Sequence, residues 1–118
     1  MKTLVMSILA IGISHVAFAE SRTCSGHGYT IDYHTNGGVD DTIDYLGKIQ
    51  KGNEKPCKYA FVTNKGEYNK NPGETYILGT SRESVTLGDA KLYISEDKKS
   101  MRGSVGSDVF NGLVCTSN

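Results

Sequence analysis

Hydrophobic and polar residues alternate along much of the chain beyond residue 27. The clearest stretch covers residues 28–34. Here Tyr29, Ile31 and Tyr33 alternate with polar residues, a period of two that is typical of a strand with one buried face. These three side chains are therefore expected to face a core. Similar apolar runs predict further strands at 57–63, 74–78, 84–87, 90–94, 100–105 and 111–115.

Turn-forming residues, chiefly Gly, Asn, Pro, Asp and Ser, separate these runs. They cluster at 35–38, 52–56, 64–66, 69–73, 88–89 and 95–99. About seven or eight short strands, spaced roughly ten residues apart, are typical of a small antiparallel barrel or sandwich. The fold class is therefore expected to be all-β, with both of these architectures open.

Residues 39–51 can be interpreted in two ways. One is a short helix near 40–50, because apolar residues from Val39 to Ile49 recur at steps of four, three and three. The other is a strand, because apolar residues also alternate toward the end of the segment. Gly47 would destabilise a helix interior by about 1 kcal/mol relative to Ala. A strand is therefore the favoured interpretation.

Residues 1–19 differ in composition from the rest of the chain. Lys2 precedes an uncharged, mainly apolar run that ends in a small-x-small pattern completed by Ala19. This arrangement is typical of a secretory signal peptide cleaved before Glu20. A membrane anchor fits less well, because Gly, Ser and His interrupt the apolar run. The sequence thus predicts a signal peptide followed by a single disulfide-braced domain at 20–118, located in the periplasm or outside the cell.

Three cysteines, Cys24, Cys57 and Cys115, lie in the exported domain. Export to an oxidising compartment favours a disulfide, and three single pairings are open. Cys24 precedes the strand at 28–34 and Cys115 lies in the last strand, and the first and last strands are neighbours in a closed barrel. We therefore expect a Cys24–Cys115 disulfide. Cys57 is expected to be a buried free thiol, because no neighbouring His is present to activate it as a nucleophile.

The overall charge limits the classes of partner. The chain contains 13 Lys and Arg residues and 13 Asp and Glu residues, and Lys2 leaves with the signal peptide. This balance provides no electrostatic basis for binding nucleic acid or an anionic membrane surface. A domain of about 99 residues can form one core, and we expect it to be monomeric without a membrane span.

No set of residues predicts catalysis or a metal site. A Ser-His-Asp set could be drawn from Ser25, His27 and Asp32, but the Ser lacks the G-x-S-x-G turn. His34 lies near Asp32 without the second ligand cluster that a zinc site needs. The acidic run at 40–44 lacks the ligand spacing of a calcium loop. We therefore expect no enzymatic activity, no metal and no cofactor.

Two loops present candidate binding residues. His27 lies between two glycines, which allow the backbone to bend and expose a side chain before the strand at 28–34. Tyr29 follows closely, although its place in the alternation also puts it in the core. Tyr68 lies just before the loop at 69–73. Exposed aromatic and charged loop residues often dominate binding, so we expect His27, Tyr29 and Tyr68 to contribute to it.

The layout of the exported domain includes an early Cys, a late Cys and about eight strands. It resembles the periplasmic and membrane-bound bacterial inhibitors of c-type lysozyme. That family carries a Ser-Gly-x-x-Tyr motif in the middle to later part of its barrel, whereas Ser25-Gly26 and Tyr29 stand near the start of this domain. The resemblance implies a barrel-like fold and an exported location, and it transfers no site residue.

These observations favour a module that binds or inhibits a protein or a glycan. The most specific version of this hypothesis is an inhibitor of lysozyme. Small size, disulfide bracing and loops on a rigid scaffold support that hypothesis. The alternative is an envelope or secreted structural protein, such as a virulence factor, that acts through its surface rather than through a cleft. A small hydrolase is a third and less favoured hypothesis.

Overall fold

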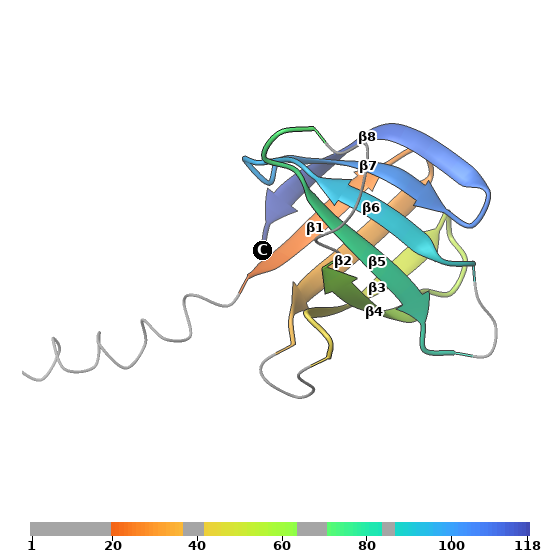
Figure 1. Ribbon diagram of the computed structural model, residues 1–118. Coiled ribbons are helices and arrows are strands. Elements are labelled where there is room, and N and C mark those ends of the chain that lie inside the picture. Colours follow the sequence, from red (N-terminus) through yellow and green to blue (C-terminus); the bar gives the residue numbers. More distant parts are fainter. Residues whose placement is uncertain (1–19, 37–41, 64–70, 84–86) are drawn as a thin grey trace, which may run out of the picture.

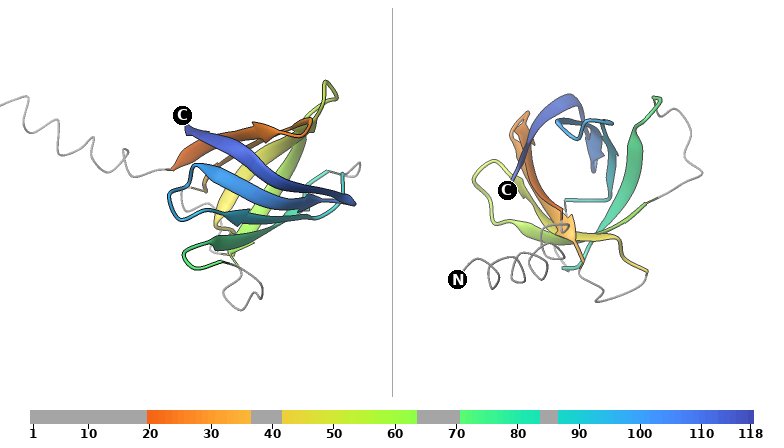
Figure 2. Two further views of the ribbon diagram at one scale, coloured as in Figure 1. Left: turned by 90° about the horizontal axis from the view of Figure 1, so that it is seen from above. Right: turned by 90° about the vertical axis from the view of Figure 1, so that its left-hand side faces the viewer.

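Eight strands pair in sequence order into one closed antiparallel barrel (Figure 1). The computed structural model describes residues 20–36, 42–63, 71–83 and 87–118. The strands are β1 (Ser21–Gly26), β2 (Tyr29–Thr35), β3 (Tyr45–Lys51), β4 (Cys57–Thr63), β5 (Thr75–Ser81), β6 (Ala90–Ile94), β7 (Ser100–Val105) and β8 (Asp108–Ser117). Each strand pairs with the next, and β8 pairs with β1. The right-hand view of Figure 2 shows the strands arranged around a central axis.

The all-β prediction is confirmed, and the architecture is a barrel. Within the described residues no helix is present, and residues 45–51 of the ambiguous segment form β3. The expectation that the first strand begins at residue 28 is wrong, because β1 precedes it. The predicted strand at 84–87 falls mostly outside the described residues, and Leu87 is not in a strand.

Buried side chains from all eight strands fill the barrel. Tyr29, Ile31 and Tyr33 are 5%, 0% and 1% exposed, which confirms their predicted core positions. An eight-stranded barrel is just wide enough for side chains to occupy its interior. The buried cluster consists of Cys24, Tyr29, Ile31, Tyr33, Ile49, Cys57, Tyr59, Phe61, Ile77, Ala90, Leu92, Ile94, Met101, Val105, Phe110, Leu113 and Cys115.

Gly47 marks a close backbone approach within the barrel wall. Gly47 on β3 is in register with Tyr33 on β2 and Tyr59 on β4. A Cβ atom at position 47 would lie 1.9 Å from the carbonyl oxygen of Asp32. Gly47 therefore lets β2 and β3 approach each other where the sheet curves to close the barrel.

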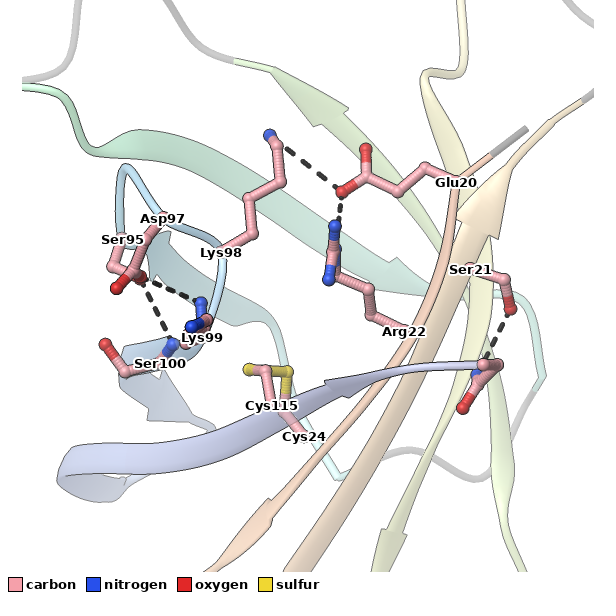
Figure 3. A network of polar contacts seen from close by, with 11 residues as sticks. Glu20, Ser21, Arg22, Cys24, Ser95, Asp97, Lys98, Lys99, Ser100 and Cys115 are labelled. Carbon is pink, nitrogen blue, oxygen red and sulfur yellow. Dashed lines mark hydrogen bonds and ion pairs between the residues drawn. A yellow bond between two sulfur atoms is a disulfide. The ribbon is translucent and has the colours of Figure 1, made fainter. Parts of the chain in front are cut away.

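The predicted Cys24–Cys115 disulfide is present and joins the two strands at which the barrel closes (Figure 3). The two residues are direct cross-strand partners on β1 and β8, and their Cα atoms are 3.9 Å apart. Both are buried. Cys57 is buried and is not in a disulfide, as expected. The covalent link therefore ties together the first and last strands of the domain.

The barrel has two ends that carry different chemistry. The His27 mouth is formed by the β1–β2 turn at 27–28, the β3–β4 connection at 52–56, the described parts of the β5–β6 connection at 82–83 and 87–89, and the β7–β8 turn at 106–107. The Glu20 mouth, at the opposite end, includes the β6–β7 turn. There Glu20 Oε2 accepts a hydrogen bond from Arg22 Nε at 2.9 Å and lies 3.9 Å from Lys98 Nζ (Figure 3). The Glu20–Lys98 ion pair thus links the N-terminal edge of the domain to that turn.

Candidate functional site

The turn between β1 and β2 presents His27 to solvent. Gly26, His27 and Gly28 all have positive φ values, 147°, 54° and 80° respectively. A non-glycine residue rarely adopts this conformation, and the flanking glycines make the local bend accessible. The His27 ring stacks on the buried Phe110 ring of β8, with centroids 6.2 Å apart and an interplanar angle of 26°. An exposed imidazole is thus held at the mouth by an aromatic support.

Tyr29 connects the core to the same mouth. Its ring is buried and lies 5.8 Å, centroid to centroid, from the Phe110 ring. Its hydroxyl donates a hydrogen bond to Asp108 Oδ2 at 2.6 Å. Lys51 Nζ lies 3.3 Å from the same carboxylate oxygen. Residues from β2, β3 and β8 therefore meet in one polar cluster beside His27.

The electrostatic state of this cluster follows from its contacts. The hydrogen bond from Tyr29, together with the Lys51 ammonium, lowers the pKa of the Asp108 carboxyl below its usual range. Burial, and then the Asp108 hydrogen bond, raise the pKa of the Tyr29 hydroxyl. At neutral pH Asp108 is therefore an anion, and Tyr29 remains a neutral hydrogen-bond donor.

A cleft of about 710 Å³ opens between the connections of the His27 mouth. It lies between the β1–β2 turn, the β3–β4 connection and the β7–β8 turn. Its lining combines an imidazole and two aromatic rings with a cation and two carboxylates. The lining residues that carry this chemistry are His27, Tyr29, Lys51, Glu54, Asp108 and Phe110.

The structure places two of the three predicted binding residues, His27 and Tyr29, in this cleft. Only the hydroxyl end of Tyr29 is near the surface, because the residue is 5% exposed. Tyr68 lies outside the described residues. Among the described residues, the cleft therefore contains two of the three predicted binding residues.

The residues weighed as a catalytic triad or as a metal site do not come together in the structure. Asp32 accepts a hydrogen bond from Thr23 Oγ1 at 2.6 Å, and within the described chain no hydrogen bond joins Ser25, His27 and Asp32. The Nδ1 atom of His34 lies 2.9 Å from the carbonyl oxygen of Thr35. Among the described residues, no group of three or more His, Cys, Asp or Glu side chains is placed to hold a metal ion.

Lys51, Asp108 and Phe110 are site residues that the sequence does not indicate. The predicted last strand starts at residue 111, which leaves Asp108 and Phe110 in an unassigned segment before it. No local pattern connects them with His27, which lies about 80 residues earlier in the chain. The β1–β8 pairing that closes the barrel brings them together.

In the described part of the chain, no helix is long and apolar enough to cross a bilayer. Comparisons with protein-family models, with curated proteins and with solved structures find no match to this chain.

Proposed function

We propose that this protein is an exported, non-catalytic binding or inhibitor module for a protein or a glycan, and that the His27 mouth is its recognition surface. The observation that carries this proposal is the convergence of three connections around His27, Phe110 and the Tyr29–Asp108–Lys51 cluster. The cleft offers the exposed His27 imidazole and both signs of charge within one concave surface.

Preorganisation of the cleft supports a role in binding. The Tyr29 ring and the Phe110 ring belong to the core, so the groups that they support are fixed by the packing of the barrel. The disulfide further links β1 to β8, the two strands that carry His27 and Phe110 at their ends. A rigid site loses little conformational entropy when a partner binds, which increases affinity without any additional contact.

Two probes test the two kinds of partner. The purified exported protein is titrated with a c-type lysozyme and with soluble peptidoglycan fragments, and lysozyme activity on bacterial cell walls is recorded in parallel. Binding of lysozyme with slower cell-wall lysis would support the lysozyme-inhibitor hypothesis. Binding of the fragments alone would support a glycan-binding module. Turnover of the fragments would contradict the non-catalytic proposal and favour the hydrolase hypothesis.

A matched pair of histidine variants locates the binding surface. His27→Ala removes the exposed ring of the cleft and is expected to weaken binding at least about tenfold, as hot-spot residues do. His34→Ala removes the second exposed histidine, at the other end of β2 and outside the cleft, and should leave binding of lysozyme unchanged. Equal affinity of the wild type and His27→Ala for a bound probe would contradict the assignment of this surface.

The exported form is expected to begin at Glu20. Intact mass of protein recovered from the periplasm or the medium measures this directly. A mature protein that retains Met1 would contradict the signal-peptide prediction, independently of the binding experiments.

A further inference from the structure

Three cations lie side by side on the outer wall of the barrel. Lys48 on β3 and Lys58 on β4 are direct cross-strand partners. The backbone N–H of Arg82, just after β5, donates a hydrogen bond to the carbonyl oxygen of Lys58 at 2.8 Å. All three residues are exposed. Neighbouring strands are about 4.8 Å apart, so the three side chains leave the wall within roughly 10 Å.

This row does not help the barrel to fold. Like charges directly opposite each other on neighbouring strands are destabilising. Within the described residues, none of Lys48, Lys58 and Arg82 forms an ion pair. The nearest acid in register is Asp32, opposite Lys48, and its carboxylate accepts a hydrogen bond from Thr23 Oγ1. Asp32 offsets one of the three cations, so the wall leaves the row with two positive charges in excess.

The same cations border a hollow of about 470 Å³, here named the Lys58 hollow. Asp32, Leu46 and the side-chain-free Gly47 also line it, so one carboxylate and some apolar surface lie beside the three cations. Among the described residues, the lining of the Lys58 hollow shares no member with the cleft at the His27 mouth. The two sites can therefore be altered separately.

We propose that the Lys58 hollow binds a saccharide that carries a phosphate or sulfate ester. A tetrahedral oxyanion has several oxygens that can accept hydrogen bonds from three converging cations at once. The apolar surface of Leu46 suits the carbon face of a sugar ring attached to that anion. This site is additional to the His27 mouth and does not depend on the function proposed for that mouth.

Titration with three probes, followed by nuclear magnetic resonance, tests the ligand class. Glucose 6-phosphate is expected to shift backbone signals of β3 and β4, and its affinity should fall as salt is added. Glucose should produce no shift, and inorganic phosphate should bind more weakly than the sugar phosphate. Absence of binding by glucose 6-phosphate would overturn the proposal. Equal affinity for inorganic phosphate would overturn the saccharide assignment.

A charge reversal with a matched control tests the location. Lys58→Glu is expected to weaken binding of glucose 6-phosphate by about tenfold or more, which corresponds to about 1.4 kcal/mol. Lys91→Glu changes an exposed lysine on β6, outside the Lys58 hollow, and the affinity should stay within about twofold. Equal losses in both variants would overturn the site, because they would indicate a general charge effect.

The stability of the Lys58→Glu variant separates binding from folding. The new carboxylate would face Lys48 across the strand pair, so the midpoint of urea unfolding should be unchanged or higher. Weaker binding in an equally stable barrel supports the proposal. If Lys58→Glu unfolds the barrel, Lys58→Gln replaces it in the same titration, and unchanged affinity of that variant would overturn the proposal.

Discussion

The hydroxyl of Tyr29 donates a hydrogen bond to the carboxylate of Asp108 over a distance of 2.6 Å, across 79 positions of sequence. The ring that carries this hydroxyl is buried against Phe110, whereas the carboxylate that accepts the bond lies at the rim of the cleft. One side chain thus belongs to the core and to the candidate site. Changes in core packing should therefore be transmitted to the His27 mouth.

Tyr29→Phe is expected to release Asp108 while keeping the aromatic core. Without the phenolic donor, the pKa of the Asp108 carboxyl should rise toward the usual aspartate range, because that hydrogen bond is the main cause of its depression. A carboxyl whose pKa is lowered in the folded state stabilises the fold above its unfolded pKa, and this contribution is lost as pH falls through the folded pKa. The wild type should therefore be more stable than Tyr29→Phe at neutral pH, with the difference shrinking in acid. Carboxyl titration by nuclear magnetic resonance and urea unfolding at several pH values measure both effects, and an unchanged Asp108 pKa would contradict the prediction.

Alkaline titration should separate Tyr29, Tyr33 and Tyr45 from ordinary tyrosines. Burial is the first cause that raises the pKa of each of these three hydroxyls. For groups with a raised folded pKa, the stabilisation is complete below the unfolded value of about 10 and is lost as pH rises through the folded pKa. Stability should therefore fall above about pH 10. Ultraviolet absorbance of tyrosinate, compared between native and urea-unfolded protein, checks this, and identical titration curves would disprove it.

The sequence predicts those strands whose inward positions are apolar. Tyr29, Ile31 and Tyr33 alternate regularly, and β2 is found where they predict it. In β1, the positions that share a face with the buried Cys24 are occupied by Arg22 and Gly26, so no apolar alternation marks that strand. It is held instead by pairing with β2 and β8. Such tertiary support leaves no local signal in the sequence.

Only the part of the candidate site that is formed by residues adjacent in sequence can be predicted. His27 can be singled out because the glycines beside it are adjacent in sequence and indicate a bend. Its aromatic support, Phe110, becomes a neighbour only when the barrel closes. The row formed by Lys48, Lys58 and Arg82 likewise depends on strand register. A change of one residue in register would move Lys48 or Lys58 to the inner face.

Loss of the disulfide should destabilise the barrel substantially. Cys24→Ser or Cys115→Ser opens a link between residues 91 positions apart, and a loss of about 2–5 kcal/mol in the free energy of unfolding is expected. Cys57→Ala removes one buried sulfur without opening a crosslink and should cost less, about 1 kcal/mol.

Urea unfolding with and without a reducing agent measures these losses. The wild type should lose stability on reduction, whereas Cys24→Ser and Cys115→Ser should not. Mapping of unreduced peptides provides a second check. A peptide that links Cys57 to either partner would contradict the assignment of Cys57 as the free thiol.

Gly47→Ala should be among the most damaging single substitutions in the barrel wall. The added methyl would lie 1.9 Å from the carbonyl oxygen of Asp32 and 3.0 Å from Cα of Tyr33, both backbone atoms of the neighbouring strand. Only separation of β2 from β3 can relieve such a contact, so the loss should reach about 3 kcal/mol or more. Gly112→Ala is the matched control, because a Cβ there would meet no atom within 4 Å, and its effect should stay within about 0.5 kcal/mol. Urea unfolding followed by circular dichroism compares the two variants. Equal stability of the two variants would contradict the close approach of β2 and β3 at Gly47.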